Sequence, residues 1–145
     1  MSIRTIASGA SAWRGYEYYT EKKVLSLSQT GEDEYTGQVA GSGPAPYQVK
    51  INIAHVRKSK CNCPHADGRR VICKHMVALF FAAFPDEAED YIEEVKEYEH
   101  QEDQRIEEHY ALLRSYVKSL SKKELQERLF EALAELEERD HKFYR

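Results

Sequence analysis

Residues 61–75 read CNCPHADGRRVICKH and contain all three cysteines of the 145-residue chain. Two pairs, Cys61-x-Cys63 and Cys73-x-His75, are separated by nine residues and together offer three thiolates and one imidazole. Such a set fills the tetrahedral coordination of a structural zinc ion and leaves no position open for a reacting water. Its soft sulfur ligands disfavour magnesium, calcium and manganese. The stretch therefore predicts one bound zinc ion per chain.

The spacing within each pair indicates the path of the backbone. Side chains two apart on a strand point to the same side, so Cys61 and Cys63 can reach one ion from an extended segment. Pro64 should end that segment, because it has no N–H for a ladder. Residues two apart in mid-helix diverge by roughly 200°. We therefore expect Cys73 at a helix N-terminus and His75 in its first turn, where free N–H groups favour a thiolate.

Two other interpretations of the cysteines are open but weaker. Free cysteines are often simply buried, yet here four candidate ligands come as two pairs around a polar, basic loop. A disulfide is disfavoured by the odd number of cysteines and by the lack of a signal-peptide pattern. Only His55 and His65 could substitute for one of the four ligands.

The order Cys-x-Cys-Pro followed by Cys-Lys-His resembles the SWIM zinc finger. The resemblance covers residues 10–84 and extends upstream of the cysteines to Arg14-Gly15 with Tyr18 and Tyr19, to Val39-Ala40-Gly41-Ser42 and to Tyr47-Gln48-Val49. It implies that Cys61, Cys63, Cys73 and His75 are the metal ligands. It also implies a small β-rich platform, a zinc knuckle and a following helix, and a role in binding DNA or proteins, since the family accompanies helicase-type ATPases, transposases and ubiquitin-ligase-like proteins.

Charge is distributed unevenly along the chain. Residues 1–75 contain 11 Lys and Arg against 6 Asp and Glu, whereas residues 76–145 contain 10 against 19. The overall net charge of −4 therefore conceals a basic first half and an acidic second half. No signal peptide and no apolar run long enough to cross a membrane is evident, so we expect a cytoplasmic protein without a membrane partner.

Three segments upstream of the cysteines have the period of two that is typical of strands, namely residues 24–28, 35–40 and 47–53. They predict an antiparallel sheet with one solvated face. A short helix is expected over residues 10–20, whose tyrosines could stack on nucleic-acid bases or anchor the helix on the sheet. Residues 1–9 are expected to fray. After His75, apolar residues at helical spacing predict a helix on the dry face of the sheet.

Downstream, the sequence predicts an acidic helical extension, so the chain divides into a zinc-binding domain, 1–84, and an extension, 85–145. Pro85 can end one helix and begin the next, and a nearly all-polar stretch, 99–104, interrupts the apolar stripe. Ser121 and Glu124 form a capping box. The stripes comprise Ile106, His109, Leu113, Tyr116 and Leu120, then Leu125, Leu129, Ala132, Leu133 and Leu136. The fold class is therefore α+β, with a C-terminal helical hairpin.

No motif for catalysis is present: there is no phosphate-binding loop, no nucleophile elbow and no His-Glu-x-x-His helix. A thiol redox switch is the one enzyme-like alternative. We expect a non-catalytic binding module in which a basic rim contacts nucleic acid, and the rim comprises Arg57, Lys58, Lys60, Arg69, Arg70 and Lys74. The alternative is a zinc adaptor for a partner protein such as a helicase-type ATPase. The hairpin could join two copies into a homodimer, bind another protein's helix, or fold back on the sheet of a monomer.

Overall fold

The computed structural model describes residues 2–142. They divide into two compact units, the first extending to Glu94 and the second starting at Val95. The helix α4, Pro85–Ser119, begins in the first unit and ends in the second. This division falls ten residues beyond residue 84, where the sequence placed the end of the zinc-binding domain. The domain boundary at residue 84 stays a prediction. In the part of the chain described, no helix is long and apolar enough to span a bilayer.

The first unit contains a four-stranded antiparallel sheet in the order β1-β2-β3-β4. Its strands are β1 Val24–Gln29, β2 Glu34–Val39, β3 Tyr47–Asn52 and the short β4 Lys60–Cys61. Val49 and Ile51 are buried, so the alternate positions point to the opposite face. That face is polar throughout and carries Ser26, Ser28, Thr36, Gln38, Gln48, Lys50 and Lys60. The prediction of an antiparallel sheet with one solvated face is confirmed.

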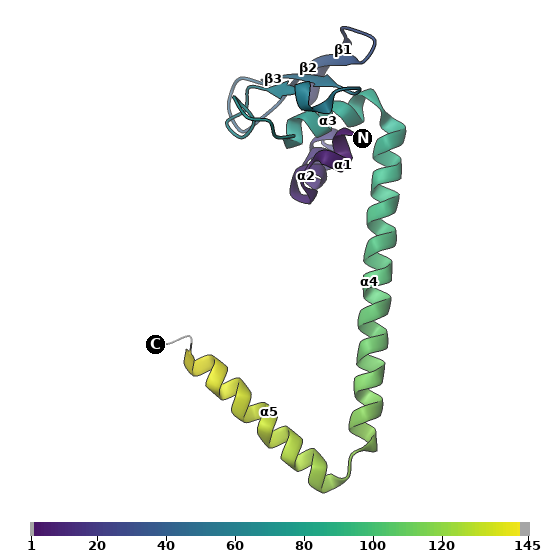
Figure 1. Cartoon of the computed structure of the whole chain (residues 1–145), viewed down its shortest axis with the longest axis vertical. Helices are drawn as coiled ribbons and strands as arrows, with labels where there is room; N and C mark the ends of the chain where they lie inside the picture. Colours follow the sequence, from purple (N-terminus) through teal and green to yellow (C-terminus); the bar gives the residue numbers. More distant parts are fainter. Residues whose placement is uncertain (1, 143–145) are drawn as a thin grey trace. The chain divides into compact units, whose positions relative to one another are not determined.

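The helix α3, Lys74–Ala83, forms the middle layer of this unit (Figure 1). It is buried continuously from His75 to Phe81 because it contacts the sheet on one side and α2, Gly9–Thr20, on the other. Gly15 allows the close packing of α2: a Cβ at that position would lie 2.4 Å from the Cβ of Val77. The helix predicted on the dry face of the sheet is therefore confirmed, and a second helix covers it.

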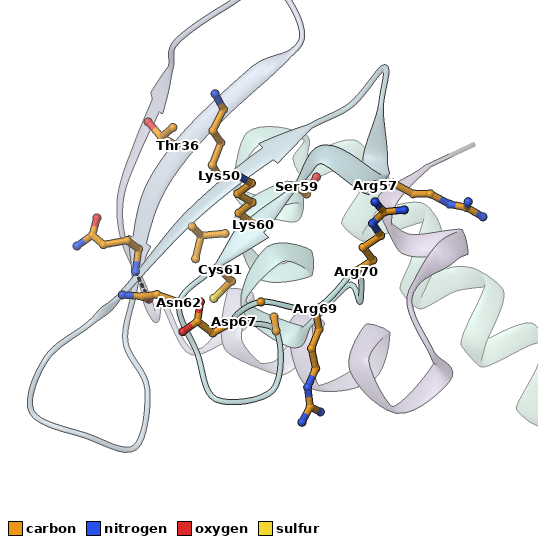
Figure 2. A pocket seen from close by; sticks show the side chains of 14 residues that line it. Thr36, Lys50, Arg57, Ser59, Lys60, Cys61, Asn62, Asp67, Arg69 and Arg70 are labelled. Carbon is orange, nitrogen blue, oxygen red and sulfur yellow. Dashed lines mark hydrogen bonds between the residues drawn. The ribbon is translucent and has the colours of Figure 1, made fainter.

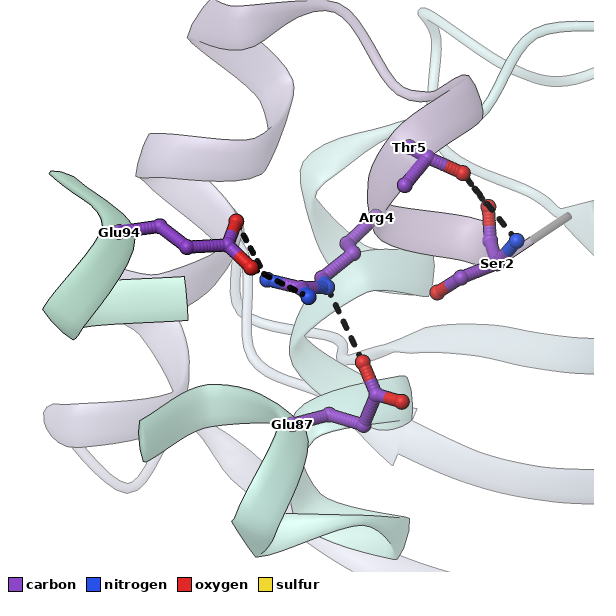
Figure 3. A network of polar contacts seen from close by, with 5 residues as sticks. All are labelled: Ser2, Arg4, Thr5, Glu87 and Glu94. Carbon is purple, nitrogen blue, oxygen red and sulfur yellow. Dashed lines mark hydrogen bonds and ion pairs between the residues drawn. The ribbon is translucent and has the colours of Figure 1, made fainter. Parts of the chain in front are cut away.

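The expectation that residues 1–9 fray is wrong for residues 2–9, the part of this segment that the structure describes. Ile3–Ile6 form a short helix, α1, in which Ile3 is completely buried in the core. The guanidinium of Arg4 donates to both carboxylate oxygens of Glu94, at 2.9 and 3.1 Å. Its Nε lies 3.0 Å from a carboxylate oxygen of Glu87 (Figure 3). Burial of Ile3 and these ion pairs fix the N-terminal segment against the first turns of α4, and neither contact has a local sequence signal.

The second unit consists of the rest of α4 and of α5, Lys122–Lys142. Both helices and their short connection were predicted, as was the capping box: the Glu124 amide donates to the Ser121 hydroxyl and the Ser121 amide donates to the Glu124 carboxylate. The polar stretch 99–104 continues the helix without a break. No side chain described between residues 95 and 140 is buried, so the apolar stripes of the hairpin remain exposed in the single chain.

Candidate metal centre and the groove beside it

The four predicted ligands lie together in the structure. The ligand atoms of Cys61, Cys63, Cys73 and His75 are all within 4.8 Å of one another, and all four residues are buried. His75 Nδ1 is 3.8 Å from the sulfurs of Cys61 and of Cys73. Tetrahedral zinc with ordinary bond lengths separates a sulfur and a nitrogen ligand by about 3.6 Å. The donor set and its spacing fit one zinc ion.

Three different local structures supply these ligands. Cys61 ends β4, and Cys63 begins a tight turn in which its carbonyl accepts from the amides of Ala66 and Asp67. Cys73 is the N-cap of α3, and His75 stands in the first turn of that helix, as the spacing predicted. The zinc ion therefore joins the edge strand, the connecting loop and the central helix. His55 and His65 lie outside the cluster.

The sulfurs of Cys61 and Cys73 are coupled electrostatically. Because the two sulfurs interact closely, the pKa of Cys73 lies well below its ordinary value and the pKa of Cys61 lies above it. Smaller contributions to the lowered pKa of Cys73 come from His75 and from the amide of Met76 at the helix N-terminus. One of the two sulfurs thus carries a charge readily, and zinc, which binds thiolates, displaces the proton from the other.

Aromatic rings surround the imidazole ligand. The ring of Tyr47 lies 4.6 Å from that of His75 and the ring of Tyr18 lies 5.5 Å from it. With Nδ1 facing the sulfurs, Nε2 is buried and has no hydrogen-bond partner among the described residues. Metal-bound histidines usually donate this second N–H to an acceptor. Here the orientation of the ring is held by aromatic packing instead.

Comparison with known proteins agrees with this geometry. The SWIM zinc finger family model matches residues 47–84, the segment from β3 to the end of α3. No curated protein and no solved structure matches the chain. Residues 47–84 are therefore a SWIM zinc finger, a class that generally serves as a binding module, and its Cys₃His cluster binds one zinc ion. The match starts at Tyr47, so the resemblance expected for residues 10–46 stays a prediction.

A groove of about 730 Å³ lies beside the zinc cluster and shares Cys61 with it. Its floor is the polar face of the sheet, and its wall is the loop from Ala66 to Arg70 (Figure 2). Basic side chains line it, namely Lys50, Arg57, Lys60, Arg69 and Arg70, against the single acidic residue Asp67. Neutral polar side chains complete it: Thr36, Gln48, Ser59 and Asn62. The arrangement suits a polyanion that also accepts and donates hydrogen bonds.

The groove gathers four of the six cations that the sequence suggested. Arg57 and Arg70 also share a smaller cavity and lie side by side in Figure 2. Lys58 lies outside the groove. Lys74 lines a separate cavity of about 340 Å³, and its ammonium lies 4.5 Å from the centre of the Tyr18 ring.

Lys50 is the groove cation that the sequence interpretation missed. It stands on the wet side of β3, next to Lys60 on β4 and 2.8 Å from the carboxylate of Glu34. The period-two alternation of the strand correctly predicted that Lys50 lies on the solvated face. Lys50 is far from the cysteines in the sequence, so the sequence did not indicate that it lines the groove.

The tyrosines of α2 pack against the hydrophobic core. Tyr16 and Tyr19 pack against Phe81 of α3, and Tyr18 packs against His75. All three are among the partly buried residues that border the core. They anchor α2 on the central helix rather than on the sheet.

Proposed function

We propose that this zinc finger is a non-catalytic module that binds the phosphate backbone of nucleic acid in the basic groove. The observation that carries the proposal is the gathering of five cations around one acidic side chain beside the metal centre. Phosphate contacts of this kind supply sequence-independent affinity. The proposed setting is the cytoplasm, where thiols stay reduced and available to zinc.

Charge pairing within the described residues supports the same role. Lys50 forms an ion pair with Glu34. The other four cations of the groove have no ion-pair partner among the described residues, namely Arg57, Lys60, Arg69 and Arg70. Four unpaired cations in one groove can each neutralise a phosphate. Binding to duplex DNA should then weaken with salt with a logarithmic slope of about −3 to −4.

The test measures binding of the zinc-loaded full chain to a fluorescent DNA duplex and to a single strand at several salt concentrations. Arg69→Gln with Arg70→Gln should weaken binding and reduce the salt slope by about two, because each arginine neutralises one phosphate. Arg70→Gln alone should reduce the slope by about one. Lys58→Gln is the matched control for this single variant, because it removes one positive charge just outside the groove.

The competing function is a zinc adaptor for a partner protein, such as a helicase-type ATPase. Failure of both nucleic acids to bind below about 100 μM at low salt, the weak limit of ordinary non-specific affinity, would favour that adaptor. Equal losses from Lys58→Gln and from Arg70→Gln alone would instead indicate diffuse attraction without a defined site.

A further inference from the structure

The helices of the second unit expose an unusual amount of apolar surface. Along α5 the side chains of Leu129, Phe130, Leu133 and Leu136 are 61%, 74%, 52% and 45% exposed. Helices of this length are marginal in water without a partner surface, and exposed stripes of this kind mark contacts. α5 therefore requires a partner.

Charge argues against α4 as that partner. If α5 folded back along α4 from their connection, residues 129–140 would lie against residues 101–112. The former stretch holds five acidic residues and one basic residue, and the latter four acidic and one basic. The two acidic stretches would repel each other, in agreement with the exposure of both apolar stripes.

A second copy of α5, unlike α4, would attract α5 electrostatically. With 100° between successive residues, Leu125, Leu129, Ala132, Leu133 and Leu136 form one stripe. Arg128 and Glu135 lie along one flank of it, and Lys122 and Asp140 lie at its two ends. Two antiparallel copies that place Leu129 against Leu133 of the second copy bring opposite charges together along this flank and at the ends of the stripe. The resulting pairs are Lys122 with Asp140 and Arg128 with Glu135, each formed twice by symmetry.

We propose that the chain forms a homodimer in which α5 pairs antiparallel with α5 of a second copy. The leucine stripe supplies the apolar contact, and the flanking pairs set direction and register. In the single chain the ion-pair partner of Arg128 is Glu131, 3.1 Å away on the exposed surface, so Arg128 can exchange partners at little cost. The dimer then presents two zinc fingers, and its existence is independent of what the groove binds.

A charge-swap series on the full zinc-loaded chain tests the proposal by sedimentation equilibrium. The unmodified chain should dimerise. Arg128→Glu and Glu135→Arg should each raise the dimer dissociation constant about tenfold, because two symmetric contacts turn repulsive. The double variant should restore dimerisation. Glu127→Arg, on the opposite side of α5, makes the same charge change as Glu135→Arg and should leave the dimer unchanged.

Leu129→Asp should abolish the dimer. A monomeric mass at every concentration would overturn the proposal. So would a double variant that fails to recover, or a Glu127→Arg dimer weakened as much as the Glu135→Arg dimer, since either result means association without this antiparallel register. Zinc content and far-UV circular dichroism show in each case whether the variant is folded.

Discussion

At the scale of single residues, the packing of α2 on α3 depends on a glycine. A Cβ on Gly15 would lie 2.4 Å from Val77 Cβ and 3.0 Å from the Lys74 carbonyl oxygen. Val77 is fully buried, so it has little room to move. The absence of a side chain at residue 15 thus decides how near α2 comes to the helix that carries His75.

We predict that Gly15→Ala destabilises the protein by about 1–3 kcal/mol, the usual cost of overpacking a core. Gly9→Ala is the matched control in the same helix, because a Cβ at residue 9 meets nothing within 4 Å. It should be neutral or slightly stabilising. Denaturant unfolding measures both, and adding Val77→Ala to Gly15→Ala should relieve part of the overpacking. Equal stability of the two glycine variants would disprove the close approach of the helices.

At the scale of elements, the sequence was most informative where a pattern has a local cause. Period-two alternation identified β1 to β3, and the Cys73-x-His75 spacing identified the start of α3. α1 escaped prediction because four residues form a helix only when Ile3 is buried and Arg4 is paired with α4. The groove could be predicted only in part. The path of the knuckle loop, which no local pattern specifies, brings Arg69 and Arg70 into the same groove as its strand cation Lys50.

The capping box of α5 leads to a pH prediction. The Ser121 amide donates to the Glu124 carboxylate and holds the pKa of Glu124 below its ordinary value of 4.5. A lowered folded pKa stabilises the helix above the ordinary value, and this stabilisation is lost as pH falls through the lowered pKa. An NMR titration of Glu124 should show a midpoint below 4.5 that rises only in part in Ser121→Ala, because alanine removes the hydroxyl but keeps the amide. A midpoint at the ordinary value in the unmodified chain would mean that the cap does not form.

At the scale of the whole molecule, the two units depend on different sources of stability. The first unit has a buried apolar core that is continuous with the zinc ligands. The second has no buried side chain among its described residues, so its helices depend on association. Loss of the metal should therefore affect the two units unequally.

We predict that Cys63→Ser or a strong chelator unfolds the first unit while much of the helix signal of α4 and α5 persists. Apparent zinc binding of about 10–16 kcal/mol matches or exceeds the whole stability of a small domain. His65→Ala is the control, since it removes an exposed imidazole two residues from Cys63 but outside the ligand cluster. Metal analysis and circular dichroism provide the readout. An unchanged melting curve after zinc removal would contradict a structural role for the metal.

Because all three cysteines belong to the zinc cluster, the folded protein suits labelling through an added thiol. Cys61, Cys63 and Cys73 are 4%, 1% and 1% exposed, and they are the only sulfhydryls in the chain. Bound to zinc and shielded from reagents, they leave the folded surface without a reactive thiol. A cysteine introduced at one chosen surface position would then be a unique attachment point for a fluorophore or spin label. The slow appearance of three further reactive groups would report departure of the ion.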